Sequence, residues 1–224
     1  MKKTLVKSLA LAFVGSLLVA GSAMALPTLE ISATGAASPV TIADEGALDA
    51  AGGANGIVAW NGALGSFTFT LSAGSTAPAI GSTAVPMMHL NGFANSGTTG
   101  GTFTVKFSAD GFGPMASGLD GFISSMGGLG GAQDLHVYYD TTNALFGQGT
   151  EIADLDVFGT SQLFSGIPAS NPFSLTMVAT IEEGAGSAAS FDDGVAPVPE
   201  PATMLLLGTG LVGLAGARRK KAQK

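Results

Sequence analysis

The sequence has no cysteine, one tryptophan and two histidines, and only 11% of its 224 residues are charged. Without cysteine the chain has no disulfide framework, no thiol nucleophile and no thiolate metal ligand. Its formal net charge of −7 argues against nucleic acid as a partner, because that function needs a basic surface. Hydrophobic residues make up 46% of the chain, which excludes a disordered protein kept in solution by charge.

Basic residues are almost absent from the middle of the chain. Lys106 is the one base there, against sixteen acidic residues between Glu30 and Glu200, which gives this body a charge of −15. The other eight bases lie at the two ends and carry +8: Lys2, Lys3, Lys7, Arg218, Arg219, Lys220, Lys221 and Lys224. The sequence therefore describes an acidic body between two basic ends.

The N-terminal end has the layout of a secretory signal peptide. Its three lysines precede an apolar run over about residues 8–20, and Ala23-Met24-Ala25 matches a small-residue cleavage site. We expect residues 1–25 to form a signal helix that engages the Sec machinery. Signal peptidase would recognise Ala23 and Ala25 and leave Leu26 as the first residue.

A second hydrophobic segment covers residues 202–217 and is followed by a basic cluster. As a helix, these sixteen residues would be about 24 Å long. That is a little less than the ~30 Å hydrocarbon core, so local thinning and side-chain snorkelling would let it span. We expect a transmembrane helix over 202–217, with residues 218–224 as a cytoplasmic tail and the acidic body outside.

Together with the residues just before it, this segment resembles the PEP-CTERM sorting signal. The likeness is carried by Val198, Pro199, Glu200 and Pro201, then the apolar helix, then Arg218, Arg219, Lys220 and Lys221. It implies processing near Pro199 to Pro201 by exosortase, a membrane-embedded, transpeptidase-like enzyme of Gram-negative bacteria. The protein would lie briefly in the inner membrane and then at the cell surface or in the extracellular matrix, often alongside exopolysaccharide. This resemblance covers about the last 27 residues and indicates a destination.

The body, residues 26–182, is predicted to be all-β. Apolar and polar residues alternate over 66–72, 102–108, 134–140 and 173–182, as in antiparallel strands with one buried face. Shorter candidates cover 29–33, 57–60, 87–91, 122–126 and 152–158, with glycine-rich turns between. We expect an antiparallel β-sandwich or jelly roll of about nine strands. Residues 35–56 would be a loop or irregular edge, and 183–201 a tether that carries the sorting motif.

The body also resembles a group of exported PEP-CTERM proteins of unknown function, which brings no activity with it. The stretches that carry this likeness are residues 62–68, 86–91, 143–147, 172–176, 184–186 and 190–192.

Motifs for catalysis or cofactor binding are missing from the sequence. No G-x-S-x-G, H-E-x-x-H or Walker-type pattern occurs, and the strand alternation places His89 and His136 on polar, solvated faces. A G-x-G-x-x-G pattern at 208–213 lies inside the apolar segment, where close helix packing explains it better than a dinucleotide does. We therefore expect neither a cofactor nor an enzyme. A hydrolase would need a carboxylate pair lining one cleft.

Several groups remain as candidates for ligand binding. Trp60, Tyr138 and Tyr139 are the aromatic residues that could stack on sugars of an exopolysaccharide. Asp154 with Asp156, and likewise Asp134 with His136, would project to one face of a strand. They lack the spacing of a calcium loop, so the metal stays unknown. Two Thr-x-Thr motifs, at 68–70 and 102–104, do not form the repeated array of an ice-binding surface.

The leading hypothesis from the sequence is a non-enzymatic cell-surface or extracellular-matrix protein, exported and processed by exosortase and associated with exopolysaccharide. The first alternative is a carbohydrate-binding module. A calcium-binding adhesin, an ice-binding protein and a hydrolase remain as weaker alternatives.

Overall fold

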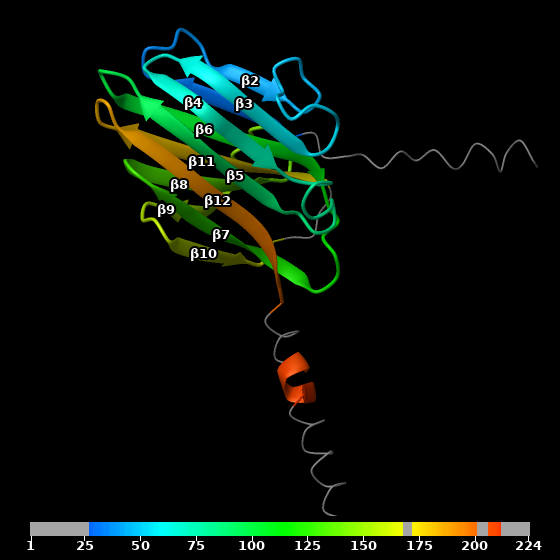
Figure 1. Ribbon diagram of the computed structural model, residues 1–224. Helices are drawn as coiled ribbons and strands as arrows, with labels where there is room; N and C mark the ends of the chain where they lie inside the picture. The colour runs from blue at the N-terminus through cyan, green and yellow to red at the C-terminus, as the bar shows by residue number, and fades with distance from the viewer. Residues whose placement is uncertain (1–26, 168–171, 201–205, 212–224) are drawn as a thin grey trace, which may run out of the picture.

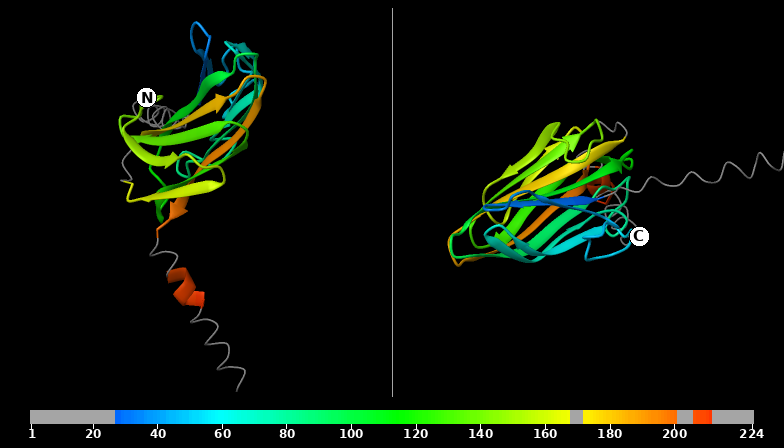
Figure 2. Two further views of the ribbon diagram at one scale, coloured as in Figure 1. Left: turned by 90° about the vertical axis from the view of Figure 1, so that its left-hand side faces the viewer. Right: turned by 90° about the horizontal axis from the view of Figure 1, so that it is seen from above.

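A computed structural model describes residues 27–167, 172–200 and 206–211. Over these residues the chain forms two six-stranded antiparallel sheets, packed face to face (Figures 1 and 2). Sheet A contains, in spatial order, β2 (Val40–Ala43), β1 (Thr28–Ala33), β6 (Gly101–Phe112), β11 (Phe173–Glu183), β8 (Ala132–Asp140) and β9 (Thr150–Leu155). Sheet B contains β10 (Thr160–Ser165), β7 (Leu119–Leu129), β12 (Ala188–Pro199), β5 (Met88–Ser96), β4 (Phe67–Ser75) and β3 (Ile57–Leu64).

The antiparallel β-sandwich expected from the sequence is confirmed, with twelve strands in the described residues where about nine were expected. The two short edge strands β2 and β10 account for part of the difference. β2 lies inside the stretch 35–56, which the sequence predicts to be a loop or irregular edge, and no alternation in the sequence indicates β10. Each is an edge strand that pairs with one neighbour, β2 with β1 and β10 with β7.

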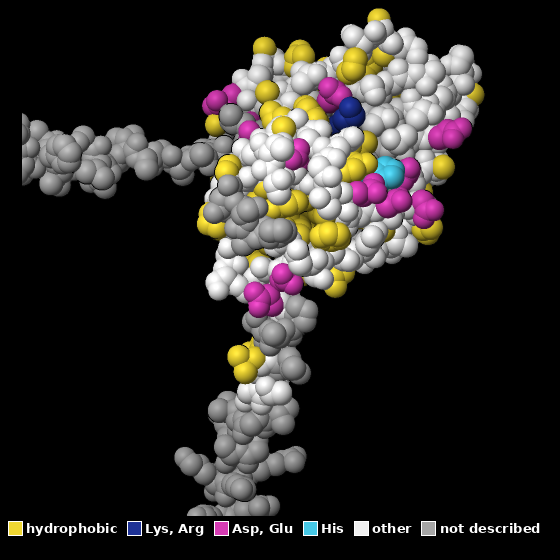
Figure 3. All heavy atoms as spheres, turned by 180° about the vertical axis from the view of Figure 1, so that it is seen from behind, with side chains coloured by type: hydrophobic (Ala, Val, Ile, Leu, Met, Phe, Trp, Pro, Cys, Tyr) yellow, Lys and Arg dark blue, Asp and Glu magenta, His cyan; other side chains and the backbone are white. Residues whose placement is uncertain are grey.

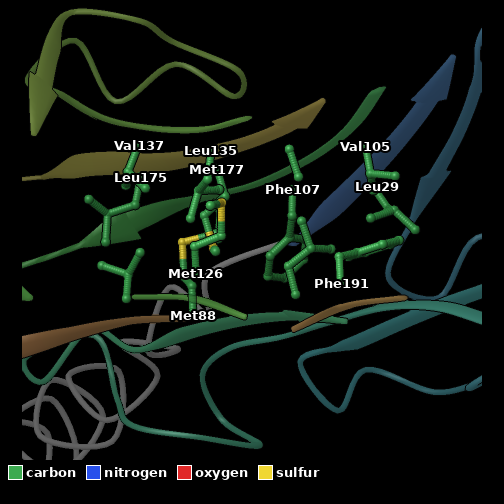
Figure 4. Packing of buried hydrophobic residues seen from close by; sticks show 14 of the residues in the cluster. Leu29, Met88, Val105, Phe107, Met126, Leu135, Val137, Leu175, Met177 and Phe191 are labelled. Atoms are coloured by element: carbon green, nitrogen blue, oxygen red, sulfur yellow. The ribbon is translucent and has the colours of Figure 1, made fainter. Parts of the chain in front are cut away.

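The core lies between the sheets and is rich in phenylalanine. Phe103, Val105 and Phe107 on β6 are all buried, as their alternation predicts. Phe103 meets Phe67 and Phe69 of sheet B with ring centroids 5.0 and 5.1 Å apart in edge-on geometry. Figure 4 shows side chains of both sheets meeting in this layer, including Met88 and Met126 opposite Met177.

One face assignment from the sequence is wrong, and a β-bulge explains it. The alternation places Leu71 with Phe67 and Phe69 on the buried face of β4, yet Leu71 is 45% exposed and Ser72 is buried. The register of β4 against β5 shifts between Phe69 and Leu71. The extra residue inverts the alternation beyond it, so Leu71 points outward.

The expected tether at 183–201 is also wrong for most of its length. Ala188–Pro199 forms β12, which pairs with β5 on one side and with β7 on the other. Its inward side chains, among them Phe191 and Val195, belong to the core. The folded domain therefore extends at least to Pro199.

The two terminal segments fall mostly outside the described residues. The signal helix at 1–25, the cleavage residues Ala23 and Ala25, and the basic residues 218–221 all lie there. Of the expected transmembrane helix, residues 206–211 are described and are helical. Among the described residues, no helix combines the length and hydropathy needed to cross a membrane.

Candidate functional site

The outer face of sheet B is a candidate binding face, built from four rows of cross-strand neighbours. The rows, in order along the strands, are Leu71, Phe93, Ser190 and Leu129; Ala73, Asn91, Asp192 and Gly127; Ser75, His89, Gly194 and Ser125; and Ala196, Ile123 and Leu163. The first and last rows are largely apolar, whereas the two middle rows are polar or small. The face therefore has a polar centre between two apolar borders.

Two open hollows lie on this outer face of sheet B. One, of about 330 Å³, is lined by Leu71, Phe93, Asn91 and Asp192 with their neighbours. The other, of about 430 Å³, is mainly apolar and is lined by Ile80, Met87, His89, Ile123 and Ala196 among others. Gly194 on β12 lines the second hollow and leaves room there because it presents no side chain.

The polar centre of the face holds a hydrogen-bonded pair and an unused acceptor. His89 Nε2 is hydrogen-bonded to the carboxylate of Asp192. His89 lines one hollow and Asp192 the other, so the pair lies between them. Asn91 Oδ1 is buried without a hydrogen-bond partner. Phe93, beside it, is 41% exposed and is the cross-strand neighbour of the equally open Leu71. Apolar surface and directed polar groups thus lie side by side.

A second cluster lies on the opposite side of the molecule, on the outer face of sheet A. We call His136, Asp134, Glu151 and Asp154 the His136 cluster; Figure 3 shows a histidine ringed by carboxylates on this face. His136 Nδ1 lies 2.7 Å from Glu151 Oε1, and its Nε2 lies 3.1 Å from Asp134 Oδ2. The pairing of β8 with β9 brings Glu151 and Asp154 beside the ring.

The carboxylates determine the protonation of the His136 cluster. Burial lowers the pKa of His136, but the hydrogen bond to Glu151 and the charges of Asp134 and Asp154 outweigh it and raise the pKa above its ordinary value. Tyr138 stacks on the imidazole with centroids 6.2 Å apart. Burial, followed by the Glu151 charge, raises the pKa of Tyr138.

The same cluster offers ligand atoms to a cation. One atom each from Asp134, His136 and Asp154 lies within 4.8 Å of the others. A site with one imidazole nitrogen and several carboxylates suits a first-row transition metal better than calcium, which takes six to eight oxygens. Asp192 and Asp193 lie within the stretch expected to be a tether, but the structure places them on opposite faces of β12, so they do not form a calcium loop.

The aromatic residues predicted to bind sugar do not form one surface. Trp60, on β3 at the edge of sheet B, packs against Phe69 and the core and is half-buried. Tyr138 is half-buried on sheet A, and Tyr139 is 96% buried against Phe173, because neighbouring residues of β8 face opposite ways. Tyr139 therefore cannot be a stacking surface.

The Thr-x-Thr motifs are separated in the same way. Thr68 and Thr70 lie on β4 of sheet B, whereas Thr102 and Thr104 lie on β6 of sheet A. The outer faces of the two sheets point away from each other, so the four threonines make no common array. Thr104 instead lies 3.2 Å from Thr180, its neighbour on β11.

The sorting residues are attached to the folded domain. Val198 and Pro199 are the last residues of β12 and pair with Gly121 and Leu119 of β7. The backbone N–H of Glu200 donates to the carbonyl of Gly118 at 2.8 Å. Pro201 lies outside the described residues.

Sequence reasoning missed the exposed pair Leu71 and Phe93. No local signal marks Leu71, because only the bulge in β4 turns it outward. Phe93 lies in a stretch whose alternation continues from Met88 and Leu90, and its parity is opposite to theirs. An apolar residue on the polar parity was the one signal that could have identified it.

Comparison with known proteins gives limited information about the body. No curated protein sequence matches the chain. Among solved structures, the carbohydrate-binding module TmCBM61, in complex with β-1,4-galactotriose, is similar at 13% identity and a TM-score of 0.32 over 57% of this chain and 87% of that one. TmCBM27, a module described for mannan recognition, is similar at 11% identity and a TM-score of 0.31 over 63% and 88%.

Comparison with family models gives a direct result for the C-terminal part. Residues 197–220 match the PEP-CTERM protein-sorting motif. The match begins within β12, includes the predicted residues Pro199, Glu200 and Pro201, and runs to Lys220, inside the basic cluster. Such a motif implies export, sorting to the cell surface and processing by exosortase. The chain thus carries a PEP-CTERM protein-sorting motif directly after, and partly within, the last strand of a twelve-stranded β-sandwich.

Proposed function

We propose that this protein is a non-enzymatic component of the cell surface or extracellular matrix of a Gram-negative bacterium. A Sec signal peptide directs it across the inner membrane, the C-terminal segment holds it there briefly, and exosortase then processes it. The sorting motif at 197–220 is the observation that carries this proposal. The absence of G-x-S-x-G, H-E-x-x-H and Walker-type patterns from the sequence supports a non-enzymatic role.

Intact-mass measurement of the extracellular protein tests the proposed processing. In cells with the exosortase, we expect a form that begins at Leu26 and lacks Arg218 to Lys224. In cells without the enzyme, the C-terminal segment should remain and the protein should stay with the membrane. A triple variant (Pro199→Ala, Glu200→Ala, Pro201→Ala) is the matched control and should behave as if the enzyme were absent. An extracellular protein that retains Arg218 to Lys224 would contradict the proposal.

The outer face of sheet B supports a second function, binding of the cell's exopolysaccharide. Sugars present apolar ring faces edged by hydroxyl groups, so their sites combine apolar surface with a few placed acceptors and donors. Phe93 and Leu71 supply the first, and Asn91, Asp192 and His89 supply the second. The described body has one base, Lys106, which lies on sheet A and is paired with Glu30 at 2.9 Å. This face therefore suits a neutral glycan better than an acidic one.

Binding to the purified matrix polysaccharide, measured by affinity electrophoresis or calorimetry, tests this second function. We expect Phe93→Ala and Asn91→Ala each to weaken binding about tenfold or more, as for a central contact. Tyr138→Ala and Trp60→Ala, which change the stacking residues expected from the sequence, should leave affinity unchanged. Loss of binding in Tyr138→Ala with none in Phe93→Ala would place the ligand on sheet A and contradict the assignment.

A further inference from the structure

The two hydrogen-bonding edges of β12, the last strand, are paired over different lengths next to the sorting motif. β12 pairs with β5 only as far as Val195, whereas its pairing with β7 continues to Pro199 and, through the N–H of Glu200, to Gly118. Among the residues that the structure describes, the strand from residue 196 onward thus pairs with β7 on one edge and has no strand partner on its other, free edge.

Prolines account for this asymmetry. Along a strand, successive N–H groups point to alternate edges. Because the N–H of Glu200 points to β7, that of Val198 does too, while the nitrogens of Pro197 and Pro199 lie on the other edge. The register shift near Pro199 skips Asp120 on β7, so it leaves the alternation of β12 intact. Proline has no N–H, so the free edge offers carbonyl acceptors and no donors at these two positions.

The segment that exosortase must recognise therefore exposes backbone acceptors on its free edge, while its backbone donors face β7. Its backbone donors, at Val198 and Glu200, are directed at β7. An enzyme that holds an extended substrate by pairing with its backbone needs both donors and acceptors. Such an enzyme has to compete with β7 for this segment.

We infer that the body holds its own sorting motif in a closed form, and that residues 196–200 must detach from β7 before processing. This inference rests on the exosortase processing proposed above. β7 acts as an intramolecular competitor, and the rate of processing follows the fraction of molecules in which the end of β12 is open. Local opening of a strand end is an ordinary low-energy fluctuation, so processing is slowed and not prevented.

Hydrogen exchange tests the closed form without the enzyme. In the full-length protein in detergent, we expect the amide of Glu200 to exchange well below the rate of an unstructured peptide. An eight-residue Gly-Ser insertion between Ala196 and Pro197 leaves residues 197–220 intact and moves them away from β7. In that variant the Glu200 amide should exchange at the free rate. Free exchange in the unaltered protein would overturn the inference.

Pulse-chase labelling in cells that contain exosortase tests the consequence. We expect the insertion variant to be processed about three- to tenfold faster than the unaltered protein, as for the release of one or two backbone hydrogen bonds. The matched control places the same insertion between Gly52 and Gly53, an exposed loop, and should be processed at the unaltered rate. An unchanged or slower rate in the Ala196–Pro197 insertion variant would overturn the inference. No processing in any variant, with the Glu200 amide still protected, would instead contradict the proposed function.

Discussion

Asp193 is a carboxyl group buried inside the sandwich, where it joins the two sheets. Both of its oxygens lie 2.8 Å from Nε2 of Gln133, so an acid of β12 is bound to an amide of β8. Burial raises the pKa of Asp193 to about 7, although the hydrogen bonds to Gln133 and to the backbone of Gly127 oppose the shift. The folded protein therefore binds a proton that the unfolded chain releases at lower pH.

The pH dependence of stability should report this group. Because the folded pKa is raised, the stabilisation is present below the unfolded value and is lost as the pH rises through about 7. The free energy of unfolding should fall by on the order of 4 kcal/mol between pH 4 and pH 8 through this group alone. Urea unfolding of Asp193→Asn should remove that slope. Asp192→Asn, at the exposed neighbour, should keep most of it, because burial and not the Asp192 charge is the main cause of the raised pKa. An identical slope in Asp193→Asn and the unaltered protein would exclude Asp193 as its source.

His136 should titrate above an ordinary histidine because Glu151 accepts its Nδ1–H. Glu151→Gln keeps the shape and removes the charge, so it should lower the pKa of His136, as read from the ring proton shifts in an NMR titration. The protonation of His136 affects the free energy of unfolding in the same direction as that of Asp193. The charged imidazole stabilises the fold at low pH, and this stabilisation is lost as the pH rises through the folded pKa. Glu182→Gln, on the same outer face, is the control. If Glu182→Gln lowers the pKa of His136 as much as Glu151→Gln does, the raised pKa comes from the summed negative charge of the sheet and not from the hydrogen bond to Glu151.

The sequence alone predicts part of these residue-level features. Period-two alternation correctly places His136 on the polar face and Tyr139 opposite it. It does not identify Glu151 as a partner, because that contact depends on how β9 pairs with β8, including a register shift between Val137 and Tyr138. Asp193 lies within the stretch predicted to be a tether, and its burial follows from strand β12, which the alternation does not indicate.

At the level of elements, close contact between the sheets depends on a glycine of β4. A Cβ on Gly74 would lie 2.3 Å from Cε2 of Phe107, which projects from sheet A. The backbone of β4 thus forms part of the wall against which this ring packs. Glycine is required at position 74 to make room for the Phe107 ring, and not for its backbone conformation, which is ordinary.

Substitution of this glycine should be costly. Gly74→Ala should lower the free energy of unfolding by about 1–3 kcal/mol through overpacking, as measured by chemical denaturation. In the double variant with Phe107→Leu the clash is relieved, so the two effects should be less than additive. Gly194→Ala is the matched control, since its nearest atom is the movable Ser125 hydroxyl at 3.2 Å. An equal loss in both glycine variants would contradict the packing argument.

Strands are predictable from this sequence where a long run alternates without interruption, as in β6, β8 and β11. Alternation fails at bulges, which shift the buried face of β4 partway along, and at Gly- and Pro-containing strands. β12 contains Gly194, Pro197 and Pro199, residues that normally indicate a loop. They are accommodated because the glycine borders a hollow and the prolines lie beyond the end of β5 pairing.

For the whole molecule, the position of β12 determines where the folding unit ends. A protein comprising residues 26–200 should fold cooperatively, whereas residues 26–182, the domain expected from the sequence, should not. The shorter chain lacks the strand between β5 and β7, together with buried Phe191 and Val195. Circular dichroism and size-exclusion chromatography distinguish the two. A cooperative transition of 26–182 at the same temperature would show that β12 is dispensable.

The central position of β12 also determines when sheet B can be completed during export. This strand follows all the others in the chain, yet it fills the gap between β5 and β7. Until it has crossed the membrane, both neighbours present unpaired edges and sheet B is divided in two. For the proposed Sec export, we therefore expect the body to complete its fold only when the sorting motif reaches the membrane. Any delay at that moment leaves two open strand edges exposed to other chains, so aggregation is the expected failure of a stalled export intermediate.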